Sequence, residues 1–84
     1  MGSIEVDVLM FGPLADLASA PKVRLTVPEG TLVASLLDRV ADRFPALRSR
    51  LGSVAVAVNL SYVPRGAPLR AGDEVALIPP VSGG

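Results

Sequence analysis

The sequence predicts an α+β fold in which one main helix crosses a mixed five-stranded sheet. Three observations lead to this prediction. Short segments alternate apolar and polar residues, a single longer segment has helical spacing, and Gly and Pro residues separate the segments. The chain has 84 residues, half of them apolar, which is enough for one domain with a small core. We expect that domain to span residues 1–79, followed by a flexible, extended Gly-Gly tail over residues 80–84.

The first third of the chain predicts two strands joined through a short helical turn. Apolar residues recur at every second position over residues 4–11, and again over residues 22–27. Between them, Gly12 and Pro13 end the first strand, and residues 13–18 suit a helical turn that begins with proline. These features predict an antiparallel hairpin.

The main helix is predicted from apolar residues at helical spacing, with charged residues on the opposite side. The apolar positions are Leu32, Leu36, Val40 and Phe44, with Val33 and Leu37 beside them. Thr31 is the expected N-cap, and Pro45 ends the helix because the residue before a proline disfavours the helical conformation.

The last third predicts strands over residues 54–58, 62–63 and 74–79, with Asn59 in a tight turn that allows positive φ. A helix between the second and third strands, in so short a chain, suggests the β-grasp, or ubiquitin-like, arrangement. In that fold the first and last strands lie parallel at the centre of the sheet. Val6, Val8, Val75 and Leu77 would then face the helix.

Composition excludes several classes of function. Eight basic and eight acidic residues balance, so the chain has neither the basic excess of a nucleic-acid binder nor a polybasic membrane patch. It contains no Cys and no His, which rules out Cys/His zinc sites, Cys nucleophiles and Ser-His-Asp triads. We expect no bound metal or cofactor. The N-terminal residues lack the pattern of a signal peptide, so the expected location is cytoplasmic.

The end of the chain is its most informative segment. Pro79 and Pro80 cannot donate to a sheet ladder, so they should lead the chain away from the last strand. The five residues after Pro79 would reach about 17 Å. Gly83 and Gly84 have no side chains and could pass through a narrow channel. The terminal carboxylate is ionised at neutral pH and could attack the α-phosphate of ATP.

The whole chain resembles the ubiquitin-like sulfur carriers that form the small subunit of molybdopterin synthase. The stretches that carry the resemblance are residues 8–12 with 14–18, residues 27–32, residues 56–59 and residues 72–84. The last is the most specific, because a Gly-Asp-Glu-Val strand followed by Pro-Pro-Val-Ser-Gly-Gly is characteristic of the molybdopterin branch. Ala15-Asp16 departs from the Arg-Glu that is frequent in the family.

The resemblance implies a co-substrate more than an enzyme. An E1-like adenylyltransferase would use ATP and Mg²⁺ to adenylate Gly84, and sulfur from a persulfide enzyme would convert the adenylate to a thiocarboxylate. Pro80, Val81, Ser82 and Gly83 would lie in a channel of the large subunit. That subunit would supply the catalytic acids and bases, in a heterotetrameric synthase that builds the dithiolene on a cyclic pyranopterin precursor.

A partner-docking surface is predicted on the sheet face opposite the helix. If Val6, Val8, Val75 and Leu77 face the helix, strict alternation places Leu9, Phe11, Ala76 and Ile78 on the other side. An apolar outer face on a small domain usually marks a protein interface. The competing interpretation is that loops, or the short helix near Leu14 and Leu17, cover this face.

Three other functions stay open from the sequence. The chain could carry sulfur for the thiamine thiazole or for cysteine, or it could be a ubiquitin-like modifier joined to target lysines through Gly84. It could also be an interaction module with an inert tail. Asp73 and Glu74 form the one acidic pair near the tail, and a solvated turn explains them better than a steering role.

Overall fold

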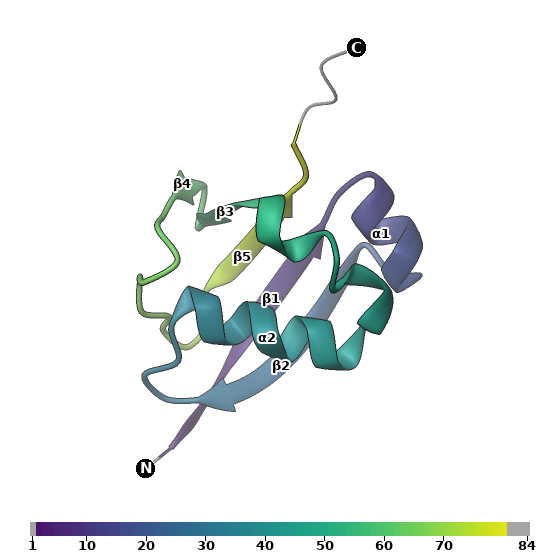
Figure 1. Cartoon of the computed structure of the whole chain (residues 1–84). Helices are drawn as coiled ribbons and strands as arrows, with labels where there is room; N and C mark the ends of the chain where they lie inside the picture. The colour runs from purple at the N-terminus through teal and green to yellow at the C-terminus, as the bar shows by residue number, and fades with distance from the viewer. Residues whose placement is uncertain (1, 81–84) are drawn as a thin grey trace.

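Five strands form one mixed sheet, and a helix crosses one of its faces (Figure 1). The computed structural model describes residues 2–80. The elements are β1 (Ser3–Met10), α1 (Pro13–Ala18), β2 (Lys22–Pro28), α2 (Val33–Arg43), β3 (Ala55–Val58), β4 (Ser61–Tyr62) and β5 (Glu74–Ile78). Two 3₁₀ helices, η1 (Pro45–Leu47) and η2 (Leu51–Ser53), connect α2 to β3.

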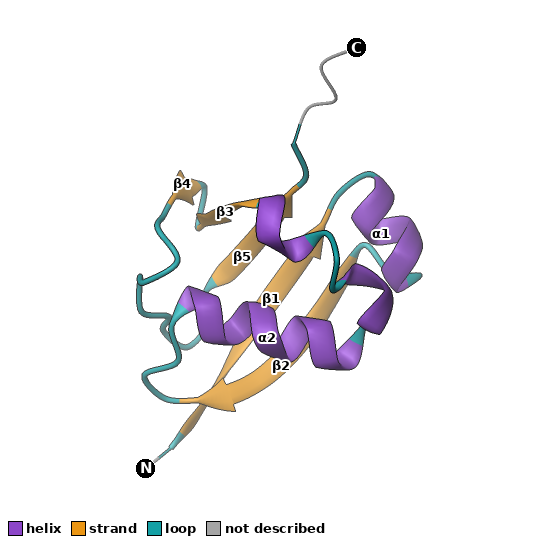
Figure 2. Ribbon diagram, viewed as in Figure 1, coloured by secondary structure: helices purple, strands orange, loops and turns teal. Residues whose placement is uncertain are grey.

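The strand order β2-β1-β5-β3-β4 confirms the β-grasp prediction. β1 pairs in parallel with β5, which is the central strand, and antiparallel with β2. β3 pairs antiparallel with both β5 and β4. Figure 2 shows both α-helices and the 3₁₀ segments on one side of this sheet. The other side is therefore an open face.

The core lies between the sheet and α2, as the alternation predicts. Val6, Val8, Val75 and Leu77 are almost completely buried, and Val8 and Val75 are paired across the parallel strands. On the helix, the buried side chains are Val33, Leu36, Leu37, Val40 and Ala41. α1 contributes Leu14 and Ala18 to the same core and contacts η1. The short helix therefore does not cover the open face.

The start of α2 differs from the prediction. Leu32, not Thr31, is the N-cap residue, and its own side chain makes no capping bond and is 40% exposed. The Thr31 hydroxyl instead donates to the Pro28 carbonyl. The first helical N–H groups donate to carbonyls of a distant loop, from Val33 to Ala67 and from Ala34 to Arg65. Tertiary contacts thus replace the expected side-chain cap.

Several strand bounds also differ from the prediction by one residue. β1 ends at Met10, which leaves Phe11 outside the strand, and β3 begins at Ala55 because η2 precedes it. β4 covers Ser61 and Tyr62, and β5 ends at Ile78 because Pro79 has no N–H for the ladder. No helix within residues 2–80 has the length and apolar character needed to span a membrane.

Candidate partner-binding face and tail

The central strand β5 fixes the point at which the tail leaves the domain. It is hydrogen-bonded on both sides, to β1 and to β3, so its end is held in place. Pro79 follows it and is half-buried, close to Gly12: a Cβ added at Gly12 would lie 3.9 Å from the Pro79 Cγ. Pro80 is exposed. Of the residues predicted to enter a partner, Val81, Ser82, Gly83 and Gly84 lie outside the described residues.

The open face carries an apolar hollow of about 240 Å³ beside the end of β5. One row of the sheet register crosses it from β1 to β4, pairing Leu9 with Ala76, Ala76 with Ala57, and Ala57 with Tyr62. The two alanines are small and sit between larger neighbours, which explains the depression. The complete lining is Leu9, Phe11, Ala57, Leu60, Tyr62, Glu74, Ala76 and Ile78.

All four residues predicted for the docking surface line this apolar hollow. Alternation in β1 and β5 did not predict Ala57, Leu60 and Tyr62 as part of this surface. The missed signal is the two-residue connection Asn59-Leu60, which makes β3 and β4 a hairpin. A hairpin places Tyr62 directly opposite Ala57 and so on the same face. The aromatic rim is accessible, with Phe11 49% and Tyr62 74% exposed.

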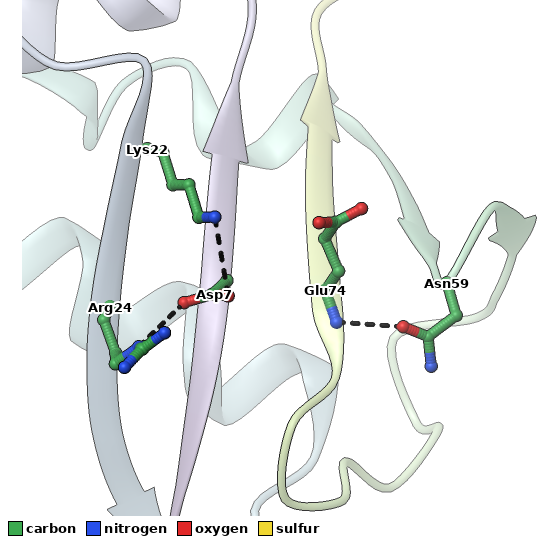
Figure 3. A network of polar contacts seen from close by, with 5 residues as sticks. All are labelled: Asp7, Lys22, Arg24, Asn59 and Glu74. Carbon is green, nitrogen blue, oxygen red and sulfur yellow. Dashed lines mark hydrogen bonds and ion pairs between the residues drawn. The ribbon is translucent and has the colours of Figure 1, made fainter.

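Beside the apolar hollow, charged residues occupy the part of the open face over β1 and β2 (Figure 3). The Asp7 carboxylate accepts a hydrogen bond of 3.0 Å from the Arg24 Nε and lies 3.7 Å from the Lys22 Nζ. The hydrogen bond from Arg24 is the main reason that the pKa of Asp7 lies below its ordinary value. Partial burial opposes this effect, and the charge of Lys22 adds to it. The only lysine in the chain is thus an ion-pair partner on this face.

Asn59 links the β3–β4 turn to the start of β5. Its amide Nδ2 donates to the Asp73 carboxylate at 2.9 Å. Its Oδ1 accepts from the Glu74 N–H at 3.0 Å, as Figure 3 shows. Its own N–H donates to the Glu74 carbonyl. Its φ is +50°, which confirms the predicted turn geometry. Asp73 also accepts from the Arg70 N–H, so this carboxylate organises the turn before β5.

Within residues 2–80, no three acidic side chains gather closely enough to hold a metal ion, and every buried side-chain polar atom has a hydrogen-bond partner. The structure places the apolar hollow beside the end of β5, where Pro79 and Pro80 begin the tail. We call this point the root of the tail.

A family model matches residues 8–84, from the second half of β1 to the last residue of the chain, and its description is the ThiS family. This chain belongs to the ThiS family. The match includes the tail residues as well as the folded domain.

Named relatives within this family match nearly the whole chain. The molybdopterin synthase sulfur carrier subunit of Mycobacterium tuberculosis is 39% identical, covering 96% of this chain and 99% of the relative. The subunit of the same name from Arabidopsis thaliana is 35% identical, covering 98% and 85%. These matches confirm the resemblance drawn from residues 72–84 and the shorter stretches.

Solved structures of similar proteins share the fold. The crystal structure of SAMP1 from Haloferax volcanii has a TM-score of 0.88 at 34% identity, covering 95% of this chain and 99% of that one. A complex of subunits 1 and 2 of the molybdopterin-converting factor from Helicobacter pylori matches with a TM-score of 0.67 at 27% identity, covering 96% and 100%. That relative was therefore solved bound to a second subunit.

Proposed function

We propose that this chain is the sulfur carrier subunit of a molybdopterin synthase. The observation that carries the proposal is the match, over almost the full length of both chains, to sulfur carrier subunits named for that synthase in a bacterium and a plant. The Pro-Pro-Val-Ser-Gly-Gly ending supports the proposal, because a sulfur carrier of this kind carries its sulfur on the terminal carboxyl group.

The reaction uses the Gly84 carboxylate as an acceptor of sulfur. The ionised carboxylate attacks the α-phosphate of ATP on an E1-like adenylyltransferase that also uses Mg²⁺, and pyrophosphate leaves. The terminal sulfur of an enzyme-bound persulfide then displaces AMP and forms an acyl disulfide. A thiol cleaves the S–S bond of that intermediate, which leaves a thiocarboxylate on Gly84 and a disulfide between the thiol and the donor enzyme. In the synthase this sulfur is transferred to the cyclic pyranopterin precursor, and water attacks the acyl carbon, breaks its C–S bond and regenerates the carboxylate. In this proposal the carrier acts in the cytoplasm, where ATP is available.

In this proposal the folded domain positions the tail, and the large subunit carries out the proton transfers. β5 is paired on both sides and ends at Ile78, so the tail starts from a rigid point. From there Pro80, Val81, Ser82 and Gly83 would extend through a channel of the large subunit. Because the last two residues lack Cβ atoms, the reactive carbonyl can approach a substrate closely.

The apolar hollow is the surface that the large subunit covers in this proposal. Leu9, Phe11, Ala76 and Ile78 lie beside the root of the tail, so a partner that surrounds the tail also lies over them. Burial of this apolar surface would supply affinity without any requirement for a charged contact. The relative solved as a complex of subunits 1 and 2 supports a partner of this kind.

A reconstituted synthase assay tests the proposal. Deletion of Gly84 should abolish dithiolene formation and leave the melting temperature unchanged. Addition of one residue after Gly84 should be nearly as damaging, because it displaces the reactive carbonyl by more than about 3 Å. Gly66→Ala is the control, since a Cβ at Gly66 meets nothing within 4 Å. Full activity of the deletion variant would refute the assignment of Gly84.

A second candidate function is protein modification through Gly84. The similarity to SAMP1 favours it, because SAMP1 is named a small archaeal modifier protein. A modifier would be recovered from cells attached to larger proteins, whereas a sulfur carrier would be recovered as a free chain. The same reconstituted assay also separates this chain from carriers that supply the thiamine thiazole or cysteine, because those would not support dithiolene formation.

A further inference from the structure

The turn between β3 and β4 has an unusual residue at its second position. The strands pair Val58 with Ser61, which leaves Asn59 and Leu60 as a two-residue loop. Both have positive φ, +50° and +73°. Two-residue hairpin loops of this kind normally use Asn-Gly, because the left-handed region brings a Cβ atom too close to a carbonyl oxygen, a conformation that Gly adopts freely and Asn tolerates. A leucine here strains the backbone.

Leu60 is also the most exposed of the large apolar residues that the structure describes. Its exposed fraction is 95%, against 74% for Tyr62 and 49% for Phe11. The isolated domain therefore gains almost no burial from this side chain, although the backbone carries the strain. Neither packing nor turn geometry explains a leucine at this position. Strained residues that a fold does not need point to a function.

The turn holds Leu60 in a fixed place. The Asn59 side chain bonds to both Asp73 and Glu74, and its N–H bonds to the Glu74 carbonyl, so the loop is tied to the central strand. Leu60 lies on the rim of the apolar hollow, together with Tyr62. Because the backbone of the turn is already held, little backbone entropy is lost when a partner binds the leucine.

We propose that Leu60 is an anchor residue for the large subunit of the synthase and inserts into an apolar pocket of that subunit. This inference rests on the proposed function. The large subunit is the expected occupant because the apolar hollow extends from Leu60 to Ile78, the last residue before the prolines of the tail. A protein that encloses the tail and lies over the hollow reaches Leu60. Interface energy is usually concentrated in a few such side chains.

Two substitutions separate the anchor role from a role in folding. Leu60→Gly and Leu60→Asn relieve the backbone strain, so the melting temperature should be unchanged or a few degrees higher. The Kd for the cognate large subunit, measured by calorimetry with the full-length chain, should rise by about tenfold or more. Leu32→Asn is the matched control: it removes a 40% exposed leucine from the opposite face and places a favoured residue at the N-cap of α2. That control should keep the wild-type Kd.

The outcomes distinguish this inference from the function on which it rests. If both Leu60 variants bind the large subunit within about twofold of wild type while Phe11→Asp binds weakly, the anchor role is wrong and the proposed function stands. Loss of affinity for the activating enzyme alone would also overturn the assignment to the large subunit. If the wild-type chain does not bind the large subunit, both the inference and the proposed function fail.

Discussion

At the scale of single residues, the Asp7 carboxylate gives a prediction for the pH dependence of stability. Its folded pKa lies below its ordinary value, so its ionised form is stabilised by folding. This contribution is fully present above the ordinary pKa of about 3.9 and is lost as the pH falls through the folded pKa. Asp7→Asn should therefore destabilise the protein at pH 7, and the difference from wild type should shrink below about pH 4.

Denaturant unfolding at neutral and acidic pH measures this difference. Asp38→Asn, on the exposed side of α2, is the control for the general effect of removing one negative charge. If the stability of wild type and Asp7→Asn fell in parallel over the whole acidic range, the ion pairs with Arg24 and Lys22 would contribute nothing to folding.

Asn59 shows how far the sequence can predict the role of a residue. Its place in a turn with positive φ follows from local chemistry, because Asn tolerates that conformation. Its side-chain bonds reach Asp73 and Glu74, which are 14 and 15 residues away. No local pattern predicts such a contact, since it depends on β3 and β5 becoming neighbours in the sheet.

At the level of elements, α2 supplies the apolar side chains that cover one face of the sheet. Leu36 and Val40 are fully buried against the strands. Leu36→Ala and Val40→Ala should each lower the free energy of unfolding by about 1.5–4 kcal/mol, through lost burial and the cavity left behind. Arg39→Ala, on the exposed side of the same helix, is the control. A loss below about 0.5 kcal/mol in either core variant would contradict the observed helix register.

The open face gives a prediction about binding. Phe11→Asp places a charge on the rim of the apolar hollow, where Phe11 is 49% exposed. It should weaken binding to the large subunit or the activating enzyme far more than it lowers the melting temperature, because the charge loses its hydration only in the complex. Ser3→Asp is the control, since Ser3 is exposed at the far end of β1. Unchanged affinity for both partners would exclude this face as the docking surface.

The elements were predictable to different degrees, for physical reasons. The body of α2 and the central strands follow from periodicity, since each buries one face. The predicted N-cap of α2 was wrong, because the carbonyls of Arg65 and Ala67, in a distant loop, accept hydrogen bonds from the first N–H groups of the helix. The 3₁₀ helices η1 and η2 were not predicted, because three-residue segments show no periodicity.

For the whole molecule, the proposed function places partner binding and sulfur delivery next to each other. α2, α1 and the 3₁₀ segments cover one face of the sheet, which leaves the other face open (Figure 2). β5 carries Ala76 and Ile78 on that open face and leads directly into Pro79 and Pro80. A partner that binds the open face is therefore beside the root of the tail. Alternation in β1 and β5 predicted this face, whereas the contribution of the β3–β4 hairpin needed the sheet register.

Intact-mass spectrometry shows whether Gly84 carries sulfur. The protein is purified from cells that contain its activating pathway, and the wild type is compared with the Gly84 deletion. A thiocarboxylate replaces one oxygen by sulfur, so we expect a wild-type species heavier by about 16 Da, with the added mass at the C-terminal residue, and no such species in the deletion variant. A wild-type chain without that species, or found only attached to larger proteins, would show that Gly84 does not serve as a sulfur carrier.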